Sequence, residues 1–281
     1  MRELHVDTIK TTVKELFLEA NYVIGKDIYR KLAQCQEEEE SPIGRSILGQ
    51  IIENDDIAAR ERVAICQDTG LAILFIELGQ DVHIVGGDFN EAINQGVREA
   101  YKEGYLRKSA VNDPLFDRIN TKDNTPAIIH LSIVPGEKVK ILVTPKGFGS
   151  ENMSATKMLK PADGVQGVRD FVAATAINAG PNPCPPIIVG VGIGGTLEKA
   201  AQIAKFATLR QVGQPNPDSR YAKLEEEILT AINKSGVGPG GLGGTTTALA
   251  VHIEYFPTHI AGLPVAVNIC CHAARHAEKV L

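Results

Sequence analysis

The sequence predicts a mixed α/β fold in which a helical N-terminal part precedes strands and helices. In the first third of the chain, apolar residues recur at a helical spacing, at Ile9, Val13, Leu16, Phe17 and Ala20. Farther along, short apolar runs such as LAILFIEL and VHIVGG are bounded by turn residues, which is typical of strands. In the second half such runs alternate with longer amphipathic segments, so strands and helices are mixed along the chain.

Local signals give the bounds of several elements. Ser41 is a candidate N-cap, with Pro42 at the first helical position of SPIGRSILGQIIENDDI. The run EEEE at 37–40, just before it, is expected to be a solvated link. The buried stripe expected for this helix is Ile43, Ile47, Leu48, Ile51 and Ile52.

Two further segments have recognisable boundaries. Asp88 and Glu91 have the spacing of a capping box at the start of a helix over DFNEAINQGVREAYKEGYL. The stretch AIIHLSIVPGEKVKILVTP is expected to form two strands joined as a hairpin through Pro135, Gly136 and Glu137. We expect a single domain over residues 1–281, with a softer boundary near residues 150–165.

Composition excludes several classes of protein. Apolar residues make up 43% of the 281 residues and charged residues 22%, which is ordinary for a globular chain. The net charge of −5, without a basic stripe, argues against nucleic acid as a partner. No apolar run is long enough to cross a membrane, and the N-terminus lacks the apolar core of a signal peptide. A cytoplasmic protein is therefore expected.

The cysteines give a mixed signal. The five are Cys35, Cys66, Cys184, Cys270 and Cys271, and no two form a CxxC pair. Spacing alone therefore favours reduced, partly buried thiols over a metal site. Cys184 differs in its setting, because the prolines of PNPCPP restrict the backbone on both sides of it. A space-filling cysteine needs no such rigid mount, whereas a ligand that must point one way does.

Glycine-rich motifs could carry chemistry, each with a structural alternative. Gly190, Gly192 and Gly195 match G-x-G-x-x-G between a strand and a helix, but no acidic strand end follows about twenty residues later, as a dinucleotide fold requires. Close packing of helix and strand is therefore favoured over NAD binding. The stretches PKGFGSEN, GVGIGGT and GPGGLGGTTT could direct backbone N–H groups at a small anion, or could be ordinary turns.

Two short segments combine metal-binding and proton-transferring side chains. Cys66, Gln67 and Asp68 lie where ICQDTG enters a turn, and they offer a thiolate, an amide and a carboxylate. The structural alternative is an Asx-type turn closed by Asp68. Cys270 and Cys271 are adjacent on a strand, so they point to opposite faces and at most one of them joins a given site.

The motifs ICQDTG, KGFGSEN, PNPCPP followed by GVGIGGT, GPGGLGGTTT and VNICCHAAR occur in this order along the chain. In this respect the chain resembles the α subunit of the two-subunit class I fumarases and tartrate dehydratases. The resemblance implies a [4Fe–4S] cluster on strand-end loops, held by Cys66, Cys184 and Cys271, with one iron open to substrate as a Lewis acid. Cys35 matches no ligand motif and is expected to be structural.

The same resemblance assigns the other site residues. Gln67 and Asp68 would face the substrate, with Asp68 as the local candidate for proton transfer. Arg107, in EGYLRKS, would pair a substrate carboxylate bidentately. Gly149, in KGFGSEN, would offer a backbone contact, and His259, in PTHIAG, would lie beside the cluster as a further catalytic residue.

The resemblance also implies a partner, a separate β subunit that completes the active site, in an α2β2 assembly. The leading hypothesis is a hydro-lyase subunit that interconverts fumarate and (S)-malate by reversible hydration. The close alternative is dehydration of L(+)-tartrate to oxaloacetate, since the substrates differ by one hydroxyl. Hypotheses of other classes are an NAD-binding oxidoreductase built on the Gly190 motif and a thiol-bearing scaffold without activity.

Overall fold

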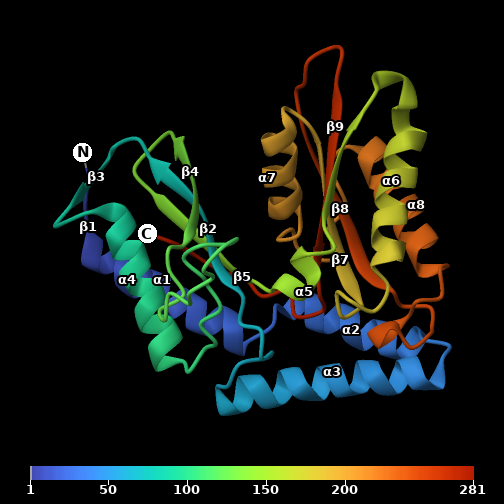
Figure 1. Cartoon of the computed structure of the whole chain (residues 1–281), viewed down its shortest axis with the longest axis horizontal. Helices are drawn as coiled ribbons and strands as arrows, with labels where there is room; N and C mark the ends of the chain where they lie inside the picture. The colour runs from blue at the N-terminus through green and yellow to red at the C-terminus, as the bar shows by residue number, and fades with distance from the viewer. Residues whose placement is uncertain (1) are drawn as a thin grey trace. The chain divides into compact units, whose positions relative to one another are not determined.

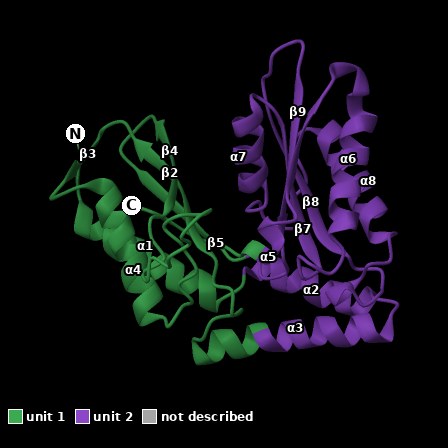
Figure 2. Ribbon diagram, viewed as in Figure 1, with its two compact units in different colours: residues 1–24, 55–148, 275–281 green, residues 25–54, 149–274 purple. Residues whose placement is uncertain are grey.

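The computed structural model describes residues 2–281, which form two compact units (Figures 1 and 2). Unit 1 comprises the residues up to Ile24, Asp55–Phe148 and Arg275–Leu281, and unit 2 comprises Gly25–Asn54 and Gly149–Ala274. Helices at the start of the chain are followed by strands and helices, so the predicted mixed α/β class is confirmed. The single domain expected over the whole chain stays a prediction.

Unit 1 is built on a four-stranded sheet with helices α1 (Val6–Tyr22) and α4 (Phe89–Glu103) packed together beside it. Across the sheet, the strands are β10 (Ala277–Val280), β5 (Val139–Lys146), β2 (Leu71–Gly79) and β4 (Ile128–Val134). A separate pair joins β1 (Arg2–His5) to β3 (Val82–Val85) in parallel. The apolar stripe predicted from Ile9 to Ala20 is buried in the core of this unit, which confirms the helical periodicity.

The two strands of the predicted hairpin do not pair with each other, so that expectation is wrong. β2 lies between them, parallel to β4 and antiparallel to β5. The turn at Pro135–Glu137 reverses the chain, but β2 buries side chains on both of its faces and takes the central place. β4 is therefore an edge strand, on which Ile128, Leu131 and Ile133 are exposed.

Unit 2 is a four-stranded sheet between helices. The strands in order are β6 (Ala155–Leu159), β9 (Leu263–Cys270), β7 (Ile187–Gly194) and β8 (Ala248–Phe256). Figure 1 shows α7 (Leu197–Ala207) on one face of this sheet, with α6 (Gly164–Ala179) and α8 (Ser219–Asn233) on the other. The remaining elements are α2 (Lys26–Glu38), α3 (Pro42–Glu61), α5 (Phe148–Glu151), η1 (Pro161–Asp163) and η2 (Pro239–Gly241). None of the helices in residues 2–281 is long and apolar enough to cross a membrane.

The glycines of β7 serve close packing. A Cβ on Gly190 would lie 2.1 Å from the carbonyl oxygen of Ala204, and a Cβ on Gly192 would lie 2.0 Å from that of Ala200. Both carbonyls belong to α7, so the absence of side chains lets this helix lie directly on the strand. The structural interpretation of the G-x-G-x-x-G motif is thereby confirmed.

Helix α3 begins as predicted but buries less than predicted. Its N-cap is Ser41, whose Oγ accepts the N–H of Gly44 at 3.1 Å. Within the predicted stripe only Leu48 is buried, and Ile43 is 58% exposed. Periodicity indicates which side chains share a face of a helix, but it does not show how much of that face the chain itself covers.

The EEEE run is not uniformly solvated, because Glu39 is fully buried. Its carboxylate accepts the N–H of Ser41 at 3.0 Å, of Thr245 at 2.9 Å and of Thr246 at 2.8 Å. The glycine-rich loop GPGGLGGTTT thus does direct N–H groups at an anion, and that anion is a side chain of the same chain. Here the expectation of a solvated link is wrong.

We predict that Glu39→Gln lowers the free energy of unfolding by about 2 kcal/mol, because an amide NH2 would then face backbone N–H donors. Burial on its own raises the pKa of Glu39, but the N–H groups of Thr245, Ser41 and Thr246 outweigh it and hold the pKa below its usual value. Such a carboxylate stabilises the fold above its unfolded pKa and loses that contribution as the pH falls through the folded pKa.

Thermal unfolding followed from neutral pH downward should therefore show the wild type losing stability steeply below about pH 4.3, and Glu39→Gln losing less. The matched control is Glu40→Gln, since Glu40 is exposed. Parallel pH profiles for the wild type and Glu39→Gln would contradict the role given to Glu39.

Candidate metal and substrate site

In unit 1, the turn from Cys66 to Gly70 leads into β2. Asp68 closes this turn, because its Oδ1 accepts the N–H of Gly70 at 3.1 Å. Its Oδ2 accepts the N–H of Phe148 at 2.9 Å, which joins the turn to the start of KGFGSEN. Both carboxylate oxygens of Asp68 therefore hold backbone, and the Asx-type turn given as the structural alternative is confirmed.

Two buried side chains anchor the same turn. The guanidinium of Arg275 donates to the carbonyl of Asp68 at 2.7 Å and to Oδ1 of Asn21 at 3.2 Å. The hydroxyl of Tyr101 lies 2.8 and 3.0 Å from two carbonyl oxygens of the turn. Burial raises the pKa of Tyr101, so this hydroxyl stays protonated and donates. The turn that carries Cys66 is thus held by Arg275 and Tyr101, and no sequence motif had indicated that these side chains act together.

Arg107 is hydrogen-bonded to this turn through its backbone, and its charged guanidinium remains accessible. Its carbonyl accepts the hydroxyl of Thr69 at 3.0 Å, while its exposed guanidinium has no partner among residues 2–281. Gln67 is exposed and Cys66 is half-buried. The structure therefore brings the predicted residues of unit 1 to one turn, with a free guanidinium suited to a carboxylate.

In unit 2, three predicted site residues lie at one end of the sheet. β7 begins just after Cys184 and β9 ends just before Cys271, and the two strands are antiparallel neighbours. A Cβ on Gly149 would lie 3.6 Å from the carbonyl oxygen of Asn182, in the same PNPCPP loop as Cys184. Cys184, Cys271 and Gly149 are thus together.

The PNPCPP loop presents its thiol and buries three of its four prolines. Pro183, Pro185 and Pro186 are buried, whereas Cys184 is exposed. The φ of Cys184 is 55°, in the left-handed region that residues other than glycine seldom adopt. Such a backbone persists only where its surroundings hold it, and it is often found at functional sites.

The five cysteines fall into two groups by exposure. Cys35 and Cys270 are buried, whereas Cys66, Cys184 and Cys271 are half-buried or exposed. The accessible thiols are the ones that the resemblance assigns to a cluster, and thiolates are the donors that Fe–S clusters take. The donor set therefore fits such a group in its chemistry and access. Within residues 2–281, no three His, Cys, Asp or Glu side chains are close enough to hold a metal ion as they stand.

His259 is not brought together with Cys184 and Cys271. It follows β8, which runs parallel to β7, so it lies beyond the opposite end of the sheet from Cys184. The length of β8 separates the two ends by about 26 Å at about 3.3 Å per residue. His259 is exposed, and its Nδ1 accepts the N–H of Ala261 at 3.1 Å.

Sequence patterns did not reveal a polar network beside Cys271. Glu151 is paired with the ammonium of Lys205 and accepts the Nδ2 group of Asn268 at 3.0 Å. Ser154 Oγ accepts the N–H of Ile269 at 3.1 Å. These contacts attach Glu151 of KGFGSEN, and Ser154 just after that motif, to the end of β9. Glu151, next to the glycine-rich turn of that motif, carried the only signal, since polar residues beside such a turn often satisfy backbone or side-chain groups.

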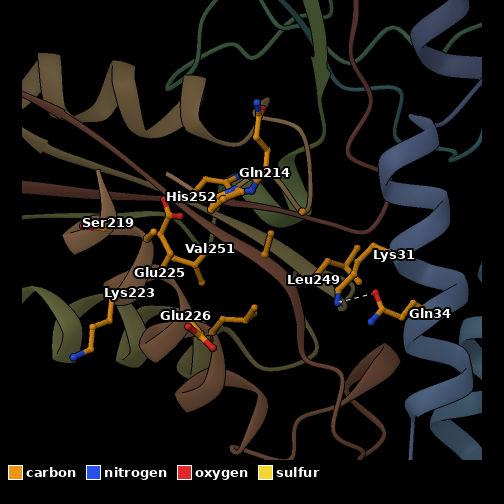
Figure 3. A pocket seen from close by; sticks show the side chains of 15 residues that line it. Lys31, Gln34, Gln214, Ser219, Lys223, Glu225, Glu226, Leu249, Val251 and His252 are labelled. Atoms are coloured by element: carbon orange, nitrogen blue, oxygen red, sulfur yellow. Dashed lines mark hydrogen bonds between the residues drawn. The ribbon is translucent and has the colours of Figure 1, made fainter. Parts of the chain in front are cut away.

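A separate cavity of about 540 Å3 lies in unit 2, and Figure 3 shows its lining from α2, α8 and β8. No predicted site residue lines it. Its buried Glu225 pairs with Arg210 and accepts the N–H of Ile253 at 2.7 Å. Burial lowers the pKa of His252 to about 4, so that this imidazole is neutral. The buried Glu225 and His252 both have partners within unit 2, and we assign no ligand to this cavity.

Comparison with known proteins agrees with the motifs. The family model described as "Fumarate hydratase (Fumerase)" matches residues 10–280. This chain belongs to the fumarate hydratase (Fumerase) family. It is a hydro-lyase of the α-subunit type, as the resemblance implied. The enzymes of this family are iron–sulfur dependent.

The relatives of this fumarate hydratase family member span bacteria and archaea. A protein of Methanocaldococcus jannaschii, "Putative L(+)-tartrate dehydratase subunit alpha", is 42% identical over 275 residues, 96% of either chain. "L(+)-tartrate dehydratase subunit alpha" of Escherichia coli K12 is 33% identical over 259 residues, 91% of this chain and 84% of the relative. The protein of the same name from Shigella sonnei has the same identity and coverage.

We predict that iodoacetamide modifies Cys66, Cys184 and Cys271 of the reduced, cofactor-free chain at least about tenfold faster than Cys35 and Cys270, because alkylation needs an accessible thiolate. Burial also raises the pKa of the Cys35 thiol, which makes its thiolate scarce. Peptide mass spectrometry over a time course measures each rate. Modification of Cys35 as fast as Cys184 would contradict the grouping of the cysteines.

Proposed function

We propose that this chain is the α subunit of an iron–sulfur dehydratase that converts L(+)-tartrate to oxaloacetate. The observation that carries the proposal is the unpaired guanidinium of Arg107 beside the Cys66 turn, in a chain whose relatives share the name tartrate dehydratase subunit alpha. The reaction breaks a C–O bond on one carbon and a C–H bond on the next. Water leaves, and the resulting enol becomes oxaloacetate by moving a proton from oxygen to carbon.

We assign Cys66, Cys184 and Cys271 as the ligands of a [4Fe–4S] cluster. When bound, a cluster with one iron free of cysteine supplies a Lewis acid for the departing hydroxyl group. The accessibility of these thiols and the rigid PNPCPP loop support the assignment. The buried prolines keep Cys184 presented, and the Arg275 contacts keep the Cys66 turn in place.

The exposed side chains of unit 1 bind and orient the substrate in this proposal. The guanidinium of Arg107 pairs one carboxylate, and the amide of Gln67 offers a donor and an acceptor to the hydroxyl groups. Gly149 offers a backbone contact without a side chain in the way.

In this proposal the main role of Asp68 is to hold the turn, because both of its carboxylate oxygens accept backbone N–H groups. We therefore assign removal of the carbon-bound proton to a group of the β subunit. His259 is left out of the site, because it lies beyond the far end of the unit 2 sheet. An α2β2 assembly and a cytoplasmic location complete the proposal.

Hydration of fumarate to (S)-malate is the second candidate, and the family description favours it. The test is the anaerobically purified complex with its β subunit, assayed on L(+)-tartrate, fumarate and (S)-malate. We expect kcat/KM for tartrate to exceed that for fumarate by at least about tenfold, since a site that binds the extra hydroxyl rejects an analogue without it. The reverse preference would establish the fumarate hydratase.

We predict that Cys184→Ser abolishes iron retention, because a serine hydroxyl is a poor substitute for a thiolate ligand. The matched control is Cys35→Ser, which removes a buried cysteine outside the assigned site. Iron and sulfide content of protein purified without oxygen, together with visible absorbance, is the measurement. Full iron content in Cys184→Ser would contradict the assignment of Cys184 as a cluster ligand, whichever substrate the enzyme uses.

A further inference from the structure

One segment of unit 1 presents large apolar side chains to solvent. We call residues 105–119 the apolar segment. Within it, Tyr105 is 96% exposed, Phe116 82%, Leu115 71% and Ile119 57%. Single exposed apolar side chains are normal on a protein surface, whereas several in one short connection are typical of an interaction site.

Two asparagines that follow the apolar segment hydrogen-bond to its backbone. Asn124, just beyond it, is fully buried, and its Oδ1 accepts the N–H of Ser109 at 2.8 Å and of Ala110 at 3.1 Å. Asn120 Nδ2 donates to the carbonyl of Lys108 at 2.8 Å. The backbone that supports the exposed side chains is thus held by the buried amide of Asn124 and the exposed amide of Asn120.

The outer part of the segment is held in the same way. Oδ1 of Asp113 accepts the N–H of Leu115 and of Phe116, both at 2.7 Å. The two apolar side chains that follow are therefore presented from a closed turn. A turn of this kind is formed before any partner arrives, so ordering it on binding costs little conformational entropy.

Backbone strain is concentrated in residues 105–124, which are the apolar segment and the few residues after it. Among the described residues, six other than glycine have φ in the left-handed region, and four of them are Tyr105, Arg118, Lys122 and Asn124. Surrounding contacts must maintain such conformations, and they cluster at sites with a function. The fifth of the six is Cys184, the proposed cluster ligand.

The apolar segment is attached to the turn that carries the unit 1 site residues. Thr69 Oγ1 donates to the carbonyl of Arg107 at 3.0 Å, and Asn124 Nδ2 donates to the carbonyl of Gly70 at 3.1 Å. The turn is thus bonded to one residue within the segment and to one just beyond it. A protein that covers the apolar segment is thereby placed beside Arg107 and Gln67.

We propose that the apolar segment is the docking surface of the β subunit. This inference rests on the proposed function, in which a partner completes the site beside Arg107. The partner has an apolar surface that receives Tyr105, Leu115 and Phe116, with its own substrate-binding groups at the edge nearest Arg107. Aromatic anchors in well-packed positions carry much of the binding energy of an interface.

The experiment measures the affinity of the separately purified α and β subunits by titration calorimetry, without substrate. Leu115→Ser with Phe116→Ser should raise the Kd at least about tenfold, as loss of two central anchors does. The control is Val280→Ser, which changes an apolar side chain of the same unit that is 54% exposed and lies outside the segment. Its Kd should match the wild type.

Hydrogen exchange on the wild-type chain gives a measurement that needs no variant. Amides of residues 108–122 should gain protection when the β subunit is added. An unchanged Kd in the double variant, absence of that protection, or failure of the wild-type subunits to bind each other would each overturn the proposal. A wild-type α chain that dimerises without β and becomes monomeric in the double variant would identify a second copy as the occupant instead.

These outcomes are distinguishable from failure of the proposed function. Binding and hydrogen exchange are measured without turnover. A complex that forms through the segment but acts on neither tartrate nor fumarate counts against the dehydratase and leaves the docking surface standing.

Discussion

The loops of this chain depend on side-chain oxygens that accept backbone N–H groups. A buried N–H without a partner is costly, and the long glycine-rich and irregular stretches have no helix or sheet to provide one. Each of the acceptors bonds at least two N–H groups: Glu39, Asp68, Asn124, Glu225 and Asn233. Most of these N–H groups belong to loops, which are thus held by side chains as well as by backbone.

Contacts of this kind hold the residues of the candidate site in place. In unit 1, Asp68 and Arg275 fix the turn that carries Cys66, and the same turn is bonded to Arg107. In unit 2, buried prolines and the Glu151 network hold the loops that carry Cys184 and Cys271. Residues that contact no substrate therefore decide where the chemical groups lie, which is the arrangement that a preorganised site requires.

Local patterns predicted much of the fold, and non-local contacts account for what they missed. The stripe of α1 and the N-cap at Ser41 depend on neighbours within a few residues, so they were readable. The supposed hairpin failed because β2, far away in sequence, inserts between its strands. Glu39 was misjudged as part of a charge run, although it continues the helical spacing of the buried positions of α2.

Those positions are Ile28, Leu32 and Cys35, and the next member of the series is Glu39. A glutamate in phase with a buried stripe was thus a readable signal of a buried acceptor, but its partners lie some two hundred residues away. The candidate site likewise combines features that local sequence predicts with features that depend on non-local contacts. Motif order indicated the thiols, whereas the strand end at which His259 lies depends on sheet topology that the motif does not contain.

The two edges of the unit 1 sheet differ in how they resist further strands. At one edge, β10 carries Glu278 and Lys279, which pair with Lys140 and Glu15. At the other, IIHLSIV of β4 has no charged or proline residue, and Ile133 is 71% exposed. Its outer row of peptide groups is a template for any extended segment, and nothing on the strand repels one. Concentrated solutions of the lone subunit will consequently tend toward edge-to-edge aggregation, so that co-production with a covering protein is the practical route to soluble material.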